Sequence, residues 1–278
     1  MRRILRRDPK LIRATDENGS TPLILAAYWA GVAEVKELLA HGADPNAKND
    51  SGVAALIPAT DNLETTRVLV EAGADVNART AVGDSALIVA ARRAGAAPVA
   101  AYLIDKGADV TASTQGGATA LHRAAESGDL DMIKLLLGRG SNVNAQRKGG
   151  RTALATAVAL GRVSAVRYLL SRGAKPNIGD VGLDQAVLQG NFEIVKALLD
   201  AGAELKDGRE PLLVFACFSY NADPQIVKML LDRGADPAAR SQLGKTPLEL
   251  ARERGYEEVA SLLVQVLGQK QSKENKNP

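Results

Sequence analysis

The hydrophobic residues of this chain recur in pairs of short helical patterns that are separated by polar turns. In TPLILAAYWAGVAEVKELLAHGADPNA (residues 21–47), a narrow apolar edge is followed by a stronger apolar stripe. These positions are Leu23, Ala26 and Ala27 in the first segment and Val35, Leu38 and Leu39 in the second. Thr21 suits the N-cap of the first helix and Pro22 its first position, and Thr246 and Pro247 repeat the arrangement. Neither helix can bury its apolar face alone, so the pattern predicts helix pairs that stack on their neighbours.

The turn between pairs is also repeated. ARSQLGKT (residues 239–246) fits a loose form of the phosphate-binding P-loop, but the same frame of Ala followed five residues later by Gly recurs along the chain. The other copies lie at 14–21, 47–54, 78–85, 112–119 and 145–152. The position of Lys245 is held by Ser20, Val53, Asp84, Ala118 and Arg151 in these copies. No phosphate chemistry fixes that position, and we interpret the stretch as the turn of a repeat with a period of about 33 residues.

These units strongly resemble the ankyrin repeat, whose motif reads T-P-L-H-x-A-A, then G, then V-x-x-L-L, then G-A-D-x-N-A. The resemblance covers nearly all of residues 1–267 and implies an all-α repeat solenoid of about eight helix-turn-helix repeats with hairpin-like loops. We place an N-terminal capping half-repeat at 1–15 and repeats at 16–48, 49–79, 80–113, 114–146, 147–178, 179–206, 207–240 and 241–267, followed by a polar flexible tail at 268–278. Compressed repeats such as residues 59–79 look like those of bacterial ankyrin proteins.

Several local features predict how individual repeats begin, end or deviate. Seven glycines fall where a left-handed residue should end a second helix: Gly42, Gly73, Gly107, Gly140, Gly173, Gly202 and Gly234. Pro58 should distort the first helix of the second repeat, and the early turn glycines Gly179 and Gly208 should shorten two loops. Residues 219–225 add about three residues between two helices and should form a bulging loop. The half-repeat should bury Ile4 and Leu5 and end at Asp8 and Pro9, and the last helix should fray after Leu267.

Composition favours a soluble globular protein. The 278 residues are 46% hydrophobic and 24% charged, and no run approaches the roughly 18 apolar residues of a membrane span. The basic start lacks the apolar stretch of a signal peptide, which favours the cytoplasm. A net charge of +3 is too small to indicate a nucleic-acid surface. Cations nevertheless crowd the start at Arg2, Arg3, Arg6, Arg7, Lys10 and Arg13, either as a solvated face or as a contact for an acidic partner.

Few residues of the chain are candidates for metal binding or catalysis. Two histidines and one cysteine are too few for a structural zinc site of His and Cys ligands, although carboxylate sites remain open. His41 beside Gly42 should cap a helix, and the resemblance gives His122 a structural role in hydrogen bonding within and between repeats. Neither histidine belongs to a repeat next to that of Cys217, so the thiol has no activating neighbour. We therefore expect no enzyme, no catalytic residue, no cofactor and no metal.

The resemblance also implies where a partner would bind. In the ankyrin fold, the fifth and sixth residues after the Leu of T-P-L face the concave surface, which together with the loop tips forms the usual contact surface. The pairs are Tyr28-Trp29, Arg92-Arg93, Glu126-Ser127, Ala159-Leu160, Leu188-Gln189, Cys217-Phe218 and Glu253-Arg254, with Asp61-Asn62 of the distorted repeat in doubt. Among them we select Tyr28, Trp29, Arg92, Arg93, Glu126, Leu160, Leu188, Phe218 and Arg254 as the candidate partner-binding residues.

Two zones follow from these residue types. An aromatic and arginine zone, from Tyr28 to Arg93 along the row of pairs, would clamp a polar or acidic segment. An apolar strip would be formed by Ala159, Leu160, Leu188, Cys217 and Phe218. The alternative is that Trp29 and Phe218 merely cover gaps at irregular helix junctions. We predict a monomeric, non-catalytic scaffold that binds another protein, without a membrane span. The alternatives are the regulatory or targeting region of a larger enzyme or electron-transfer protein, and a binder of acidic or nucleic-acid surfaces through the basic N-terminus.

Overall fold

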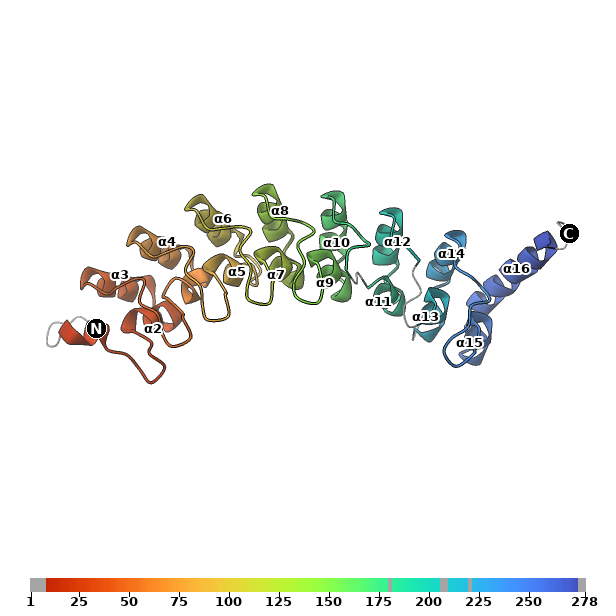
Figure 1. The fold of residues 1–278 in the computed structure, drawn as a ribbon, viewed down its shortest axis with the longest axis horizontal. Helices are drawn as coiled ribbons and strands as arrows, with labels where there is room; N and C mark the ends of the chain where they lie inside the picture. Colours follow the sequence, from red (N-terminus) through yellow and green to blue (C-terminus); the bar gives the residue numbers. More distant parts are fainter. Residues whose placement is uncertain (1–8, 180–181, 206–209, 220–221, 275–278) are drawn as a thin grey trace. The chain divides into compact units, whose positions relative to one another are not determined.

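The computed structural model describes residues 9–179, 182–205, 210–219 and 222–274, and these residues are helical with short connecting loops. They fall into two compact units, the first up to Ala153 and the second from Leu154. Within each unit, the first helices of successive pairs form one row and the second helices form another (Figure 1). In the described part, β-structure is limited to isolated bridges, between Arg79 and Ser85 and between Ser113 and Thr119.

The first unit contains four successive helix pairs behind a short entry turn. Its elements are η1 (Pro9–Arg13), α2 (Pro22–Trp29), α3 (Val32–Ala40), η2 (Pro58–Asp61), α4 (Leu63–Glu71), α5 (Ala86–Ala90), α6 (Ala97–Asp105), α7 (Ala120–Ser127) and α8 (Leu130–Gly138). The first helices α2, η2, α5 and α7 pack in sequence, as do the second helices α3, α4, α6 and α8. The stacked helix pairs predicted from the hydrophobic pattern are confirmed.

The second unit continues the same alternation. Its elements are α9 (Ala153–Ala159), α10 (Val163–Ser171), α11 (Leu183–Leu188), α12 (Phe192–Asp200), α13 (Leu212–Phe218), α14 (Pro224–Asp232), α15 (Pro247–Glu253) and α16 (Glu257–Glu274). Here α11 packs on α13 and α13 on α15, while α10, α12, α14 and α16 pack in sequence. The first helices are short, with six or seven residues each in α11, α13 and α15.

The core lies between the helices of each pair and between neighbouring pairs. One fully buried leucine of each second helix illustrates the stripe seen in the sequence, as in Leu38, Leu69, Leu103 and Leu136. Full burial of such a side chain stabilises the fold by about 1.5–3 kcal/mol relative to exposure. The first helices contribute many buried alanines beside larger residues such as Leu23 and Ile88, and the small alanine side chains allow the helices to approach closely.

The predicted helix ends are present. The Thr21 hydroxyl accepts the Ile24 N–H at 3.4 Å, and Thr246 forms a capping box with Glu249 in which the Thr246 N–H donates to Oε2 at 2.7 Å. The seven glycines expected to end second helices have φ between 85° and 92°. This left-handed conformation closes each helix at little cost only because glycine lacks a Cβ.

Asparagine side chains join consecutive loops. Asn46 Nδ2 donates to the Gly73 oxygen at 2.9 Å, while its Oδ1 accepts the Asp75 N–H at 2.7 Å. Asn77 makes the same two bonds one repeat later, and Asn177 does so in the second unit. These bonds satisfy loop backbone groups that no helix or sheet satisfies.

Two regions depart from the regular pair of α-helices. Pro58 lies in the 3₁₀ helix η2, which replaces a regular first helix, so the predicted distortion is confirmed. At the N-terminal end, Pro9–Arg13 form the 3₁₀ helix η1, which packs on α2 and buries Ile12. Ile4 and Leu5, expected to anchor the capping half-repeat, lie outside the described residues, as does most of the arginine cluster.

The predicted fraying after Leu267 is wrong. Helix α16 continues without interruption to Glu274, and only residues 275–278 lie outside the described part. The polar residues after Leu267 include good helix formers, and Lys270 Nζ forms an ion pair with Asp236 Oδ1 at 3.1 Å. The loops expected at Gly208 and at residues 219–225 lie partly outside the described residues.

Candidate binding surfaces

Two aromatic side chains extend from the end of α2 in the first unit. Tyr28 is 45% exposed and Trp29 is 85% exposed. Their rings stack with centroids 5.8 Å apart and planes inclined by 29°. Trp29 therefore does not cover a gap between helices, and its large apolar face is open to solvent.

Arg92 and Arg93 follow α5 and are both exposed. Arg93 Nη1 lies 3.3 Å from Asp61 Oδ2, at the end of the neighbouring η2, in a solvent-exposed ion pair. Such pairs contribute about 1 kcal/mol or less, so a partner carboxylate can replace Asp61 at small cost. Arg92 makes no ion pair with any residue in the described part of the chain.

Glu126 is already engaged within the first unit. Its carboxylate lies 3.0 Å from Arg123 Nη1 and 3.5 Å from Arg147 Nη1. Arg147 comes from the following loop, so Glu126 joins a first helix to a loop tip. A partner would have to compete with two cations of the chain to bind this carboxylate.

In the second unit, the predicted apolar strip is only partly exposed. Leu160 is 50% exposed and Leu188 is 37% exposed. Cys217 is completely buried, so its assignment to the strip is wrong. Burial raises the pKa of its thiol to about 12, which keeps it protonated and unreactive. The side chain of Phe218, rather than that of Cys217, reaches the surface.

Arg254 covers Phe218. Its guanidinium carbon lies 5.4 Å from the ring centroid, and Nη1 donates a hydrogen bond to the Phe218 oxygen at 3.0 Å. Phe218 is half-buried under this side chain. These two candidate residues thus interact with each other, and an approaching partner would meet the outer face of the guanidinium.

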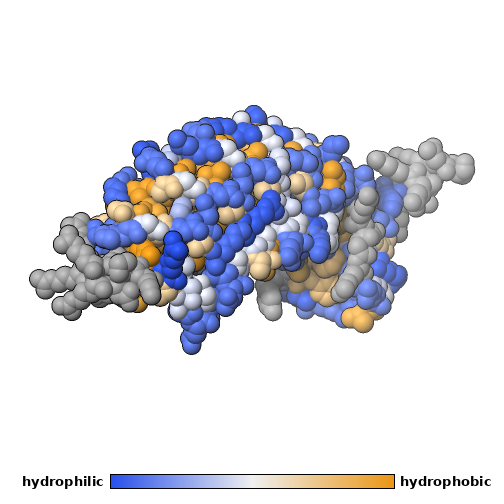
Figure 2. Space-filling view, turned by 60° about the vertical axis from the view of Figure 1, so that its left-hand side comes forward, coloured by the Kyte–Doolittle hydropathy of each residue, from blue (hydrophilic) through white to orange (hydrophobic). Residues whose placement is uncertain are grey.

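The face seen in Figure 2 is largely hydrophilic, with hydrophobic residues gathered in smaller groups between hydrophilic bands. A surface of this kind favours recognition by a few exposed aromatic and charged side chains over a broad apolar contact.

Both histidines serve the fold. His122 Nδ1 lies 2.9 Å from the Thr119 hydroxyl and Nε2 lies 3.1 Å from the Arg151 oxygen, so its ring joins a first helix to the next loop. Burial lowers the pKa of His122, which favours the neutral ring. His41 Nδ1 lies 2.8 Å from the Glu37 oxygen at the end of α3. The structural role of His122 and the capping role of His41 are confirmed.

The P-loop-like stretch forms an ordinary repeat turn. Thr246 caps α15, and Lys245 Nζ lies 2.6 Å from Glu253 Oε2. Lys245 is therefore paired within the repeat. Among the described residues, no group of three or more His, Cys, Asp or Glu side chains could hold a metal ion.

Sequence reasoning missed a pocket of about 550 Å³ in the second unit. Its described lining consists of Leu188, Gln189, Gly190, Ser219, Ala222, Asp223 and Pro224. The signal available was the longer connection at residues 219–225, from which Ser219, Ala222, Asp223 and Pro224 line the pocket.

Paired helices, short loops and stacked repeats define this protein as an all-α repeat protein. The family model described as "Ankyrin repeats (3 copies)" matches residues 2–80, 23–114, 62–147, 87–180 and 183–275. The chain belongs to the ankyrin repeat family. Ankyrin repeats typically mediate protein binding, and the matched residues are accounted for by these repeats.

Similar proteins include a bacterial relative. The chain is 45% identical over 94 residues to YahD of Escherichia coli (strain K12), which is named as an ankyrin repeat protein; this covers 31% of the chain and 46% of YahD. It is 43% identical over 166 residues to the potassium channel AKT1 of Arabidopsis thaliana, covering 58% of the chain and 19% of the channel. It is 40% identical over 92 residues to the E3 ubiquitin-protein ligase Ufd4 of Drosophila melanogaster, covering 31% of the chain and 3% of the ligase. The chain therefore spans less than half the length of these relatives.

No helix in the described part of the chain combines the length and the apolar character needed to cross a membrane.

Proposed function

We propose that this chain is a non-catalytic scaffold that holds a partner protein against the ends of its first helices and against its loop tips. The observation that carries the proposal is Trp29, whose side chain is 85% exposed and stacked on Tyr28. A tryptophan contributes nothing to the core in this position, whereas aromatic and arginine side chains often dominate the energy of protein interfaces.

We further propose that the first unit binds an acidic segment of the partner. Arg92 makes no ion pair within the described residues, and Arg93 is held only by an exposed pair with Asp61. Both arginines follow α5, which packs on η2, and η2 packs on α2, the helix that ends in Tyr28 and Trp29. A carboxylate of the partner would pair with the arginines while an apolar neighbour covers the indole.

The only tryptophan of the chain provides a direct test. Titration with poly-L-glutamate should change the fluorescence of Trp29 in a salt-dependent manner, and poly-L-lysine should not. Capture of the partner from a lysate of the source cell, followed by binding measurements with the purified partner, should then show lost affinity for the Trp29→Ala/Arg93→Ala variant.

A matched control is Lys134→Ala, on the second helix α8, where the lysine forms only an exposed pair with Asp131. This variant should retain full binding, and both variants should melt close to the unmodified protein. If the double variant binds the purified partner as tightly as the control does, the aromatic and arginine surface does not carry the interaction.

A second candidate function is a regulatory or targeting region within a larger protein. The supporting observation is that the chain resembles small parts of large relatives, 19% of AKT1 and 3% of Ufd4. Detection of the native protein in the source cell with an antibody against this chain would test it. A product of about the mass of this chain alone, 29.1 kDa, would exclude this candidate.

A further inference from the structure

In the second unit, side chains at the ends of first helices donate hydrogen bonds to the ends of preceding first helices. Gln189 Nε2 donates to the Ala159 oxygen at 3.2 Å, joining α11 to α9. Arg254 Nη1 donates to the Phe218 oxygen at 3.0 Å, joining α15 to α13. Both donors occupy the same repeat position, the sixth residue after the Leu of the T-P-L motif. The carbonyl groups at helix ends lack partners within their own helix, so these bonds satisfy them from outside.

The corresponding bond between α13 and α11 is missing. The residue at the equivalent position is Phe218, which has no side-chain donor. Within the described residues, the carbonyl oxygens of Leu188 and Gln189 accept no hydrogen bond. The C-terminal end of α11 therefore presents free acceptors with partial negative charge.

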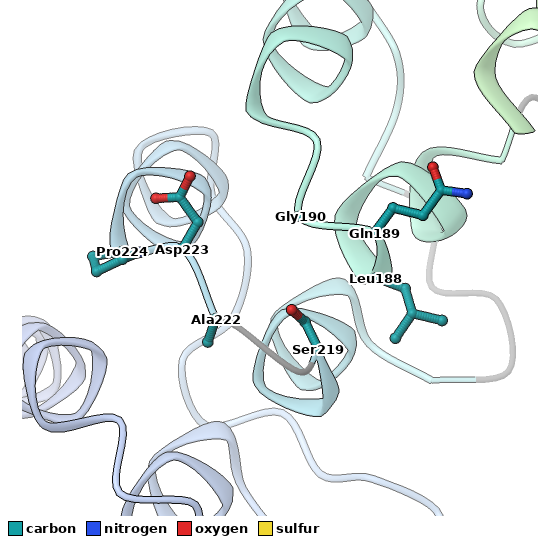
Figure 3. Close-up of a pocket in the computed structure, with 7 residues that line it drawn as sticks. All are labelled: Leu188, Gln189, Gly190, Ser219, Ala222, Asp223 and Pro224. Atoms are coloured by element: carbon teal, nitrogen blue, oxygen red, sulfur yellow. The ribbon is translucent and has the colours of Figure 1, made fainter. Parts of the chain in front are cut away.

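The pocket of about 550 Å³ lies at this end of α11. Figure 3 shows Leu188, Gln189 and Gly190 on one side, Ala222, Asp223 and Pro224 on the opposite side, and Ser219 between them. Leu188, Ala222 and Pro224 supply apolar surface. Ser219, Gln189 and Asp223 supply polar atoms.

The polar atoms of the pocket are mainly acceptors. Asp223 is the only charged residue in its described lining. Its Oδ1 caps α14 by accepting the Gln225 N–H at 2.8 Å, and Oδ2 has no partner among the described residues. The amide nitrogen of Gln189 already donates to Ala159, which leaves Oε1 as an acceptor.

We propose that this pocket binds an arginine side chain of a partner protein. The guanidinium group carries five donors in a planar fork and a permanent positive charge, which complement the Asp223 carboxylate and the free carbonyl oxygens. Its methylene groups would lie along Leu188 and Pro224. Arg254 illustrates the same recognition inside the chain, since it covers Phe218 and donates to the end of α13.

This inference rests on the proposed protein-binding role but concerns the second unit, and it has its own test. The probe is a short acetylated peptide with one arginine between leucine and glycine residues. Its neutral counterpart carries citrulline, which has nearly the shape of arginine without its charge. Binding is followed by amide chemical shifts of Gly190 and Ser219 in the ¹⁵N-labelled full chain.

The arginine peptide should shift these resonances with an affinity about tenfold or more above that of the citrulline peptide, as expected for a charged hydrogen-bonded contact. Asp223→Asn should abolish this preference. Asparagine is also a good N-cap, so the fold should be retained. The matched control is Asp129→Asn, which changes another helix-capping aspartate, at α8 in the first unit, and should leave the preference intact.

Equal binding of the two peptides, no binding of either, or an arginine preference that persists in Asp223→Asn would each overturn the proposal. These outcomes are distinct from failure of the proposed function, which is judged by the Trp29→Ala/Arg93→Ala variant. The pocket could fail to bind arginine while that variant still loses the partner.

Discussion

The guanidinium of Arg254 lies 5.4 Å from the ring centroid of Phe218 and donates to the backbone oxygen of the same residue at 3.0 Å. The Arg254 side chain thus covers an aromatic ring and also donates a hydrogen bond to a backbone carbonyl at the end of a helix. Helix α13 has seven residues and ends at Phe218, and its C-cap is Ser219 rather than a left-handed glycine. The next repeat therefore supplies a hydrogen bond to the C-terminal end of α13.

Arg254→Ala should lower the free energy of unfolding by about 1–2 kcal/mol, because both a cation–π contact and a charge-assisted hydrogen bond are lost. Arg254→Lys should cause a smaller loss, since the ammonium keeps the charge but not the planar fork. Urea unfolding followed by circular dichroism measures both values. An unchanged midpoint for Arg254→Ala would show that the contact is too solvated to stabilise α13.

The repeat architecture could be predicted because its signals are local. Thr21 and Pro22 start a helix through their own side chains, and Gly42 ends one through its own backbone. Repetition of these signals at one period indicates stacking, since each pair has an apolar face to bury. Pro58 likewise acts on the helix in which it lies.

The candidate surfaces were harder to predict because exposure depends on neighbouring repeats. Cys217 and Phe218 are adjacent in sequence, yet Cys217 is completely buried while Phe218 reaches the surface. A helix turns by about 100° per residue, so one position decides between core and surface. The side chain that covers Phe218 comes from Arg254, 36 residues later at the same repeat position, and the repeat pattern alone does not show that it lies over the ring.

The last helix shows that polar composition alone does not predict where a helix ends. The polar residues after Leu267 suggested a flexible tail, but residues with good helix propensity can extend a helix that is already started. Lys270 also reaches Asp236, a loop residue after α14. Polarity indicates that a segment is solvated, and it does not distinguish a solvated helix from an irregular tail.

His122 should make stability depend on pH. Burial is the main cause that lowers its pKa in the folded state, while an unfolded histidine has a pKa of about 6.5. The unfolded chain therefore takes up more protons as the pH falls below about 6.5, and stability is lost in that range. Above this range the ring is neutral in both states and its contribution is fully present.

Between pH 7.5 and 5.5, the free energy of unfolding should fall as the pH falls, through this group. His122→Gln should remove most of this dependence, since glutamine can occupy the same capping-box position without titrating. His41→Gln is the control, because it replaces the other histidine of the chain with the same residue. A dependence that disappears in His41→Gln and persists in His122→Gln would contradict the assignment.

Cys217 should react only after the second unit opens. Its side chain is completely buried and burial raises the pKa of the thiol to about 12, so the reactive thiolate is scarce at neutral pH. Alkylation by iodoacetamide at pH 8 should be slower in the native chain by about a hundredfold or more than in the denatured chain. Because this is the only cysteine, mass spectrometry of the intact chain reports the opening directly. Labelling at the denatured rate without denaturant would show that α13 is not packed as described.

Alanine substitutions at Gly83 and Gly73 should distinguish the cost of a left-handed backbone from the cost of a steric clash. Both have positive φ, 85° and 89°. A Cβ at Gly83 would lie 2.9 Å from the Gln115 nitrogen, which donates to the Val82 oxygen and so joins consecutive loops. A Cβ at Gly73 would meet no heavy atom within 4 Å. Gly73→Ala should therefore cost only the left-handed strain, about 1–2 kcal/mol.

Gly83→Ala should cost that strain plus about 1–3 kcal/mol more, because the clash is with backbone and can be relieved only by separating the two loops. The difference between the two variants in urea unfolding measures the contribution of the loop contact. Hydrogen exchange at the Gln115 amide should accelerate in Gly83→Ala and stay unchanged in Gly73→Ala. Equal losses in both variants, with Gln115 equally protected, would mean that the loops can move apart without cost and that helix packing alone holds these repeats together.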